Sequence, residues 1–70
     1  MPYVDTIAQV AAEHGLSKSD ITGPSRRPDI CAARWEAMRR LRAKSLSLPS
    51  IGRLLNRHHT TVLDGLRRVG

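Results

Sequence analysis

Residues 47–68, SLPSIGRLLNRHHTTVLDGLRR, predict two short helices joined by a tight turn. Ser47 is a good N-cap, because its hydroxyl can accept from the orphan backbone donors of the first turn, and Pro49 is tolerated that early in a helix. Asn56 tolerates the left-handed backbone that ends a helix. The second helix then opens with four polar side chains, residues 58–61.

Apolar residues recur at helical spacing in both predicted helices. They are Ile51, Leu54 and Leu55 in the first helix, and Val62, Leu63, Leu66 and Val69 in the second. A glycine inside a short helix is destabilising by roughly 1 kcal/mol relative to alanine, so Gly52 predicts a packing constraint. A helix-turn-helix needs a small residue where its two helices cross closely, and Gly52 fits that place. The alternative is an ordinary helical hairpin in a small helical protein.

The composition predicts an all-α fold. Seventy residues make one domain, 1–70, near the lower limit for a self-supporting core. Hydrophobic residues are 40% of the chain, with no Phe, one Trp and one Tyr, so the core must consist mostly of Leu, Ile, Val, Ala and Met. No run alternates apolar and polar residues as a strand would. We expect helices over about 4–14, 18–21, 29–44, 48–55 and 59–69.

The positive charge is unevenly distributed along the chain. The net charge is +6, yet residues 1–25 carry one base and three acids, whereas residues 26–70 carry eleven bases and three acids. This asymmetry predicts a surface that faces a polyanion, and its coincidence with the helix pair favours nucleic acid. The alternative is a solvated basic face.

Two further segments carry signals of their own. Ser17 and Asp20 have the spacing of a capping box, and Asp29 suits the N-terminus of the longest predicted helix as its cap. The solvent side of that helix is expected to carry bases that suit phosphates: Arg34, Arg39, Arg40, Arg42 and Lys44. Arg26 and Arg27 lie between two prolines, which predicts either a solvated linker or an arm that places one of them in a DNA minor groove.

These residues together resemble a known family, the C-terminal DNA-binding domain of the bacterial replication initiator DnaA. The resemblance covers roughly residues 4–69, and its most specific parts are Ser47-Leu48-Pro49 with Ile51-Gly52, and His59-Thr60-Thr61-Val62. It implies an all-α helical bundle of the Trp repressor-like class. Its helix-turn-helix would bind double-stranded DNA-box sequences at replication origins and some promoters.

The resemblance also implies a set of DNA-contacting positions. It places Arg26 or Arg27 in the minor groove, Leu48 and Pro49 against the DNA backbone, and Arg34 near the start of the long helix. The tip of the recognition helix supplies His59, Thr60 and Thr61. A threonine hydroxyl can donate or accept, and its methyl can pack on a thymine methyl. The full predicted DNA-binding set is Arg26, Arg27, Arg34, Arg40, Leu48, Pro49, Arg57, His58, His59, Thr60 and Thr61.

The chain departs from the family pattern in four places. His58 stands where the family has an Asp that could accept from a cytosine amino group. The turn at Asn56 and Arg57 is about one residue shorter, and Glu36 stands where the family tends to be apolar. No glycine-rich loop ending in Gly-Lys-Ser/Thr occurs, so we expect a regulator of replication initiation or transcription without ATPase activity of its own, as a free-standing protein or as part of a longer one.

Other function classes fit the sequence less well. Ser50 with His59 or Asp64 would lie on short helices without a nucleophile elbow, so no enzyme is expected. The three histidines lack metal-ligand spacing, and no cofactor motif occurs. One cysteine, no signal peptide and no membrane-spanning run favour a cytoplasmic location, and the resemblance implies a bacterial, nucleoid-associated one.

The main rival hypothesis is a small basic protein-interaction module that binds an acidic partner. A third is non-specific coating of DNA or RNA, although the chain lacks interleaved aromatics for base stacking. Salt dependence and a preference for one duplex would separate these hypotheses. No apolar stripe is left unused by the predicted core, so a monomer is expected.

Overall fold

The chain folds into five helices in the computed structural model, which describes residues 2–69. They are α1 (Pro2–Glu13), α2 (Lys18–Thr22), α3 (Pro28–Ala43), α4 (Leu48–Leu55) and α5 (His59–Val69), and this described range contains no strand. The predicted all-α class is therefore confirmed. The bounds of α4 and α5 match the expected ones, whereas those of α1, α2 and α3 differ by one or two residues. Residues 1 and 70 of the expected domain lie outside the described residues.

The longest helix, α3, begins differently from the prediction. Arg27 takes the N-cap position without a side-chain cap, and Pro28 occupies the first helical turn. The fixed φ of proline already suits the first helical position, which explains the earlier start. Asp29 lies inside the first turn instead of capping it, where the helix dipole still favours its negative charge.

Two serines cap α2 and α4, as the sequence predicts. Ser17 and Asp20 form a complete capping box: the Ser17 hydroxyl accepts from the Asp20 amide at 3.2 Å, and the Ser17 amide donates to Asp20 Oδ2 at 2.9 Å. The Ser47 hydroxyl accepts from the Ser50 amide at 3.3 Å at the start of α4. These bonds fix where α2 and α4 begin.

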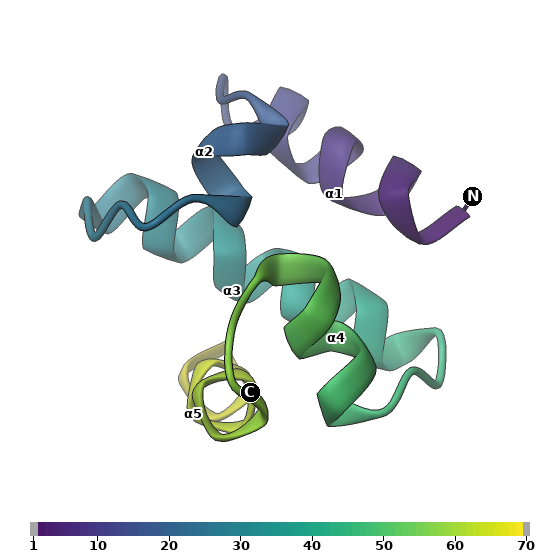
Figure 1. Cartoon of the computed structure of the whole chain (residues 1–70). Helices are drawn as coiled ribbons and strands as arrows, with labels where there is room; N and C mark the ends of the chain where they lie inside the picture. Colours follow the sequence, from purple (N-terminus) through teal and green to yellow (C-terminus); the bar gives the residue numbers. More distant parts are fainter. Residues whose placement is uncertain (1, 70) are drawn as a thin grey trace.

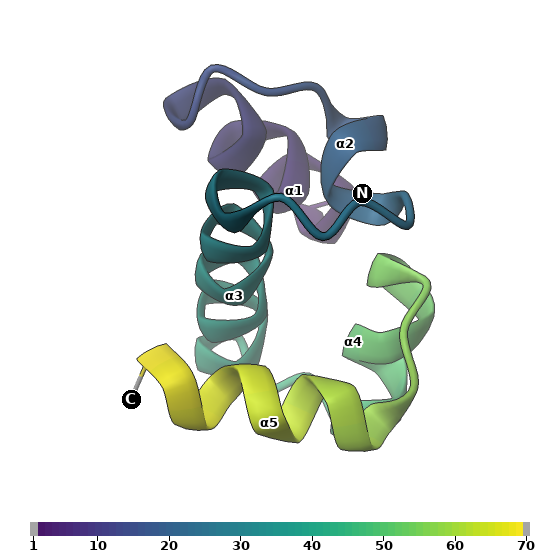
Figure 2. The same ribbon diagram turned by 90° about the vertical axis from the view of Figure 1, so that its left-hand side faces the viewer.

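Helix α3 runs through the middle of the molecule. Figure 1 shows α1 and α2 on one side of it and α4 and α5 on the other. The view turned by 90° in Figure 2 shows α5 lying across α3 near its C-terminal half, with α4 beside both. The two helices of the predicted helix-turn-helix, α4 and α5, therefore pack on one side of α3, with α1 and α2 on the other.

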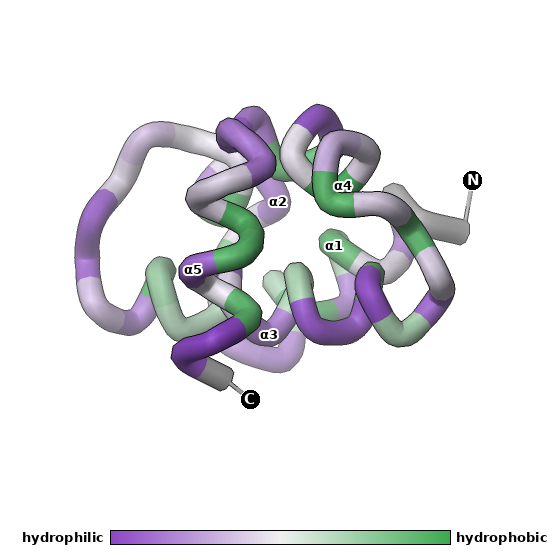
Figure 3. Tube along the Cα trace, turned by 90° about the horizontal axis from the view of Figure 1, so that it is seen from below, coloured by the Kyte–Doolittle hydropathy of each residue, from purple (hydrophilic) through white to green (hydrophobic). Residues whose placement is uncertain are grey.

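The core lies between these helices. Its buried members are Ile7, Val10, Ala11, Ile21, Ala33, Ala37, Met38, Leu41, Ile51, Leu55 and Val62. Figure 3 shows that α4 and α5 each alternate between hydrophobic and hydrophilic segments, as amphipathic helices do. One apolar expectation is wrong, because Leu63 is 38% exposed. The Val69 side chain of the same expected stripe lies outside the described residues.

Two glycines mark close approaches of the backbone. A Cβ at Gly52 would collide with the carbonyl oxygen of Arg57, so the segment that passes Gly52 is the turn itself and not the body of α5. A Cβ at Gly65 would meet Met38 Sδ, and Trp35 Cδ1 at 2.8 Å. Helix α5 therefore crosses α3 closely at Gly65 of α5, a residue to which the sequence pattern assigns no role.

Candidate nucleic-acid interface

The turn between α4 and α5 is held by the backbone of residues 52–58. Asn56 has φ 56° and ψ 47°, the left-handed conformation predicted for it. The Arg57 amide donates to the Gly52 carbonyl at 2.7 Å. Only a residue without a Cβ leaves room for this return of the chain, which is the physical reason for glycine at position 52.

His58 caps α5. Its carbonyl accepts the amides of Thr61 at 3.0 Å and Val62 at 3.2 Å, and its ring nitrogen Nδ1 accepts the Thr60 amide at 3.3 Å. His58 Nδ1 also lies 2.8 Å from the Thr60 hydroxyl oxygen. The imidazole thus satisfies an orphan donor at the helix start, as Asp or Ser does at other helices.

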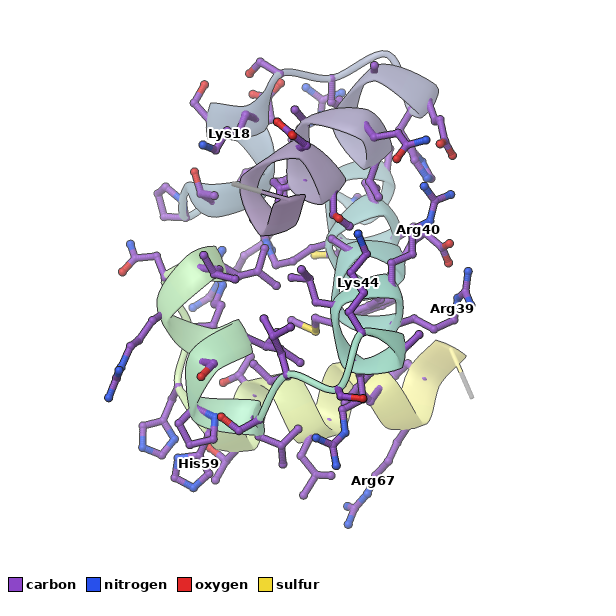
Figure 4. All side chains as sticks on the ribbon, turned by 90° about the vertical axis from the view of Figure 1, so that its right-hand side faces the viewer. Lys18, Arg39, Arg40, Lys44, His59 and Arg67 are labelled. Atoms are coloured by element: carbon purple, nitrogen blue, oxygen red, sulfur yellow. The ribbon has the colours of Figure 1, made fainter. Side chains whose placement is uncertain are left out.

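The tip of α5 is solvent-exposed. All four side chains of residues 58–61 are exposed, and the rings of His58 and His59 lie with their centroids 4.3 Å apart. Figure 4 shows His59 pointing away from the body of the molecule, at the end where α4 and α5 meet. Thr60 and Thr61 are therefore free to contact a large partner, as the hypothesis of a recognition helix requires.

Helix α4 borders this tip with its own exposed groups. Pro49 is exposed and Leu48 is half-buried, because Leu48 packs against the core. An open depression lies beside the tip, lined by Pro49, Gly52, Arg53, Asn56, Arg57, His58 and His59. Two of the exposed side chains around it, Arg53 and the imidazole of His59, can donate hydrogen bonds to an anion.

The two loop arginines differ in their surroundings. Both are exposed, on the segment between α2 and α3. Arg27 Nη2 donates to Asp29 Oδ2 at 2.8 Å, while Arg26 has no ion pair with any side chain among residues 2–69. Arg26 is therefore the arginine whose charge is not already paired within the protein.

The expectation that Arg34 lies on the solvent side of α3 is wrong. The residue is only 5% exposed. Its Nε donates to the Ile21 carbonyl at 2.7 Å, and its Nη2 donates to the carbonyls of Gly23 at 3.1 Å and Ser25 at 3.2 Å. A guanidinium has five N–H donors, and burial here is possible because backbone oxygens accept them. The buried Arg34 side chain thus bonds the backbone at the start of the α2–α3 loop.

Arg40 is also placed differently from the prediction. It donates to Glu13 on α1 at 2.6 and 2.9 Å and to Glu36 on α3 at 2.8 Å, so its charge is neutralised internally. Hydrogen bonds from Arg39 and then Arg40 lower the pKa of Glu36 to about 2. Figure 4 shows Arg39 and Arg40 on the edge of the molecule far from His59. This basic part of α3 is remote from the tip of α5.

Arg57 is half-buried at the turn. Its Nη1 donates to the carbonyls of Asn56 at 2.9 Å and Leu55 at 3.2 Å, and its Nη2 donates to the Gly23 carbonyl. Burial, followed by the nearby charge of Arg34, lowers the pKa of the Arg57 guanidinium from its ordinary value. The predicted DNA contact of Arg57 would have to compete with these internal acceptors.

Sequence reasoning missed two exposed residues at this end of the molecule. Arg53 on α4 lines the depression beside the tip, and no side-chain ion pair of Arg53 occurs in the part of the chain that the structure describes. Leu63 stands one helical turn after His59 and Thr60 on α5. A signal existed for Leu63, because neighbours on a helix point about 100° apart and Val62 already faces the core.

No group of three or more His, Cys, Asp or Glu residues within 2–69 could hold a metal ion. Nor is any helix in that range both long enough and apolar enough to cross a bilayer.

Comparison with known proteins identifies the family. A family model described as the bacterial dnaA protein helix-turn-helix matches residues 4–69. The chromosomal replication initiator protein DnaA of Picosynechococcus sp. is 45% identical over 69 residues, which cover 94% of this chain and 15% of that protein. The same-named protein of Deinococcus radiodurans is 36% identical over 66 residues, covering 93% of this chain and 14% of that protein. No solved structure matches the chain.

The chain thus spans about one seventh of the length of these two relatives. The matched residues include all of α3, α4 and the turn whose geometry is described above. Within the matched residues, α4 and α5 with the left-handed Asn56 between them have the form of a helix-turn-helix. By this match, which covers almost the whole sequence, the chain belongs to the bacterial dnaA protein helix-turn-helix family.

Proposed function

We propose that this chain binds double-stranded DNA in a sequence-specific manner, with the N-terminal end of α5 in the major groove. The observation that carries the proposal is the exposed run of residues 58–61 at the start of the second helix of a helix-turn-helix. In this motif the N-terminal residues of the second helix contact base edges, while the first helix crosses the DNA backbone. The major groove is wide enough to admit such a helix.

Each exposed group near the tip has a proposed contact. Thr60 and Thr61 contact base edges, where a hydroxyl can donate or accept and a methyl can pack on thymine. His58 and His59 donate to phosphates or bases, and Leu63 extends the apolar part of the same surface. On α4, the backbone of DNA lies against Leu48 and Pro49, with Arg53 near a phosphate.

The loop between α2 and α3 supplies the second point of contact. Arg26, or Arg27 if it releases Asp29, enters the adjacent minor groove, where narrow A·T-rich stretches concentrate negative potential. Arg34 and Arg40 do not belong to the proposed contact surface, because their donors are bound to internal carbonyls and to glutamates. The proposed surface consists of Arg26, Arg27, Leu48, Pro49, Arg53, His58, His59, Thr60, Thr61 and Leu63.

The names of the two relatives support a proposal for the biological role. Both are named as chromosomal replication initiators, so we place this chain on DNA-box-like sites at replication origins or promoters, in the bacterial cytoplasm. It would regulate initiation or transcription by occupying sites as a monomer. A helix-turn-helix domain recognises DNA and does not catalyse, so no ATPase activity is proposed for these residues.

Selection from random duplexes tests the proposal most directly. The chain is mixed with a pool of randomised double-stranded DNA, and the bound fraction is sequenced after each round against excess bulk competitor. We expect one motif to be enriched, with an affinity that falls steeply as salt rises. Salt-sensitive binding without enrichment would reduce the function to non-specific coating, and no binding to any duplex would refute it.

A further inference from the structure

The segment that carries Arg26 and Arg27, residues 23–27, begins with its backbone pressed against α2. The Gly23 amide donates to the Ser19 carbonyl at 2.8 Å. A Cβ at Gly23 would lie 2.7 Å from that same oxygen, so a side chain there would displace the segment. Because Gly23 is fixed in this way, its own carbonyl is a defined anchor point for the rest of the segment.

Arg34 holds this anchor from α3. Its Nη2 donates to the Gly23 carbonyl and, two residues further along, to the Ser25 carbonyl at 3.2 Å. Its Nε donates to Ile21 at the end of α2. The planar guanidinium therefore spans the path of the chain from α2 into the segment that precedes Arg26.

Arg57 reaches the same carbonyl from the turn of the helix-turn-helix. Its Nη2 donates to Gly23, 34 residues away in the sequence, while its Nη1 bonds the carbonyls of Leu55 and Asn56. A carbonyl oxygen has two lone pairs, so the Gly23 oxygen can accept from Arg34 and Arg57 together. Two like charges are thereby held close, and burial, followed by the nearby charge of Arg34, lowers the pKa of the Arg57 guanidinium.

We propose that Arg34 and Arg57, called here the arginine pair, are positioning residues that hold residues 23–27 against the turn. The inference rests on the proposed function, since it concerns how Arg26 or Arg27 and the tip of α5 reach the same duplex. A segment that is ordered before binding loses less conformational freedom on binding. The arginine pair thus contributes to DNA affinity without contacting DNA.

The first test measures the free protein and needs no DNA. Backbone ¹⁵N order parameters at Arg26 and Arg27 are compared in the unsubstituted chain, in Arg57→Ala and in Arg57→Lys. Lysine keeps the charge, but its point-like ammonium cannot reproduce the planar fork that joins Gly23 to Asn56. In both variants we expect the order parameters at Arg26 and Arg27 to fall from about 0.85 toward about 0.6, while those of α5 stay high. Unchanged order parameters would overturn the inference.

The second test is a double-mutant cycle on the duplex selected by the unsubstituted chain. Arg57→Ala should weaken binding by about tenfold in the unsubstituted chain, and by less than about twofold once Arg26→Ala and Arg27→Ala are already present. Equal losses in both backgrounds would mean that Arg57 contacts DNA directly. Arg53→Ala is the matched control, since this exposed arginine should give the same loss in both backgrounds.

The conservative variant separates positioning from charge. If Arg57 served as a phosphate contact, Arg57→Lys would retain most of the affinity; we expect it to bind as weakly as Arg57→Ala. Full rescue by lysine would overturn the inference. Where Arg57→Ala does not fold, the two measurements on Arg57→Lys decide the question. If the unsubstituted chain binds no duplex, the proposed function fails, and the order parameters alone decide whether the arginine pair holds residues 23–27.

Discussion

His58 caps α5 and is also exposed on the surface that we propose for DNA. Its Nδ1 accepts the Thr60 amide, and its ring stacks beside His59 at the exposed tip of α5. Replacing a capping side chain by alanine is destabilising by about 1 kcal/mol, because an orphan amide loses its acceptor. We therefore expect His58→Ala to lower the free energy of unfolding by about 1 kcal/mol in urea denaturation.

The aspartate of the family pattern provides the matched control for that prediction. His58→Asp restores a strong N-cap and adds a negative charge at the positive end of the helix dipole. This variant should be at least as stable as the unsubstituted chain. If His58→Ala were as stable as His58→Asp, the imidazole would not be acting as the cap.

Thr61 is the residue at which base recognition can be tested most cleanly. The Thr60 hydroxyl already lies against His58, whereas Thr61 is exposed two positions into the helix. Thr61→Ala should weaken binding to the selected duplex by about 1–3 kcal/mol and leave scrambled duplexes almost unaffected. Thr61→Ser keeps the hydroxyl and removes the methyl, so it separates a hydrogen bond from a thymine contact. Equal losses on both duplexes would contradict a role in sequence choice.

Charged residues were the hardest to assign from sequence. The pattern predicted which bases lie on α3, but it could not show that Arg34 would find carbonyls of residues 21–25 or that Arg40 would find Glu13. Those partners are 9 to 27 residues away and are brought close only by the packing of α1 and α2 on α3. The capping residues Ser17 and Ser47 were predictable because their acceptors and donors lie within three residues.

At the scale of the elements, Gly52 determines whether α4 and α5 can be joined by so short a turn. Alanine is the better helix former by about 1 kcal/mol, yet its Cβ would meet the Arg57 carbonyl, which is backbone and cannot rotate away. We expect Gly52→Ala to destabilise the fold by about 1–3 kcal/mol, measured as a lowered midpoint of thermal unfolding.

Arg53→Ala, one residue along the same helix, is the control for this substitution. Arg53 is exposed, so its replacement should change stability by no more than about 0.5 kcal/mol. Gly65→Ala should be tolerated better than Gly52→Ala, because one of its two neighbours is the flexible end of Met38. A Gly52→Ala variant as stable as Arg53→Ala would mean that the turn can shift to make room.

The elements themselves were largely predictable, because local chemistry specifies where α4 and α5 begin and end. Ser47, Asn56 and the polar residues 58–61 gave bounds for both helices that the structure reproduces. The mutual arrangement of the helices was not predictable in the same way. Gly65 received no role from sequence, since its significance depends on α3 side chains that approach it from 27 to 30 positions away.

On the scale of the whole molecule, the triad of Glu13, Glu36 and Arg40 joins α1 to α3. Hydrogen bonds from Arg39 and then from Arg40 lower the pKa of Glu36 to about 2, so the native state favours the ionised carboxylate. The stabilisation is fully present above pH 4.5 and is lost as the pH falls toward 2, because the unfolded chain then binds the proton more readily. Between pH 4.5 and pH 2 we expect the free energy of unfolding of the unsubstituted chain to fall by about 1–2 kcal/mol more than that of a Glu36→Gln variant. Urea denaturation of both proteins at each pH measures this difference. Parallel pH profiles for the two proteins would contradict the pairing.

The basic residues of the molecule have two different roles: Arg40 of this triad stabilises the fold, whereas exposed basic residues near the tip of α5 are proposed to contact DNA. Arg40 is neutralised by two glutamates on the side remote from His59, whereas Arg53 stands exposed beside the tip of α5. Each phosphate contact that is removed lowers the slope of log affinity against log salt by about one. Arg40→Gln should therefore reduce thermal stability and leave that slope unchanged, while Arg53→Ala should leave stability unchanged and lower the slope by about one. Titrations of both variants with one duplex at four salt concentrations check this division, and a reduced slope for Arg40→Gln would place α3 on the DNA after all.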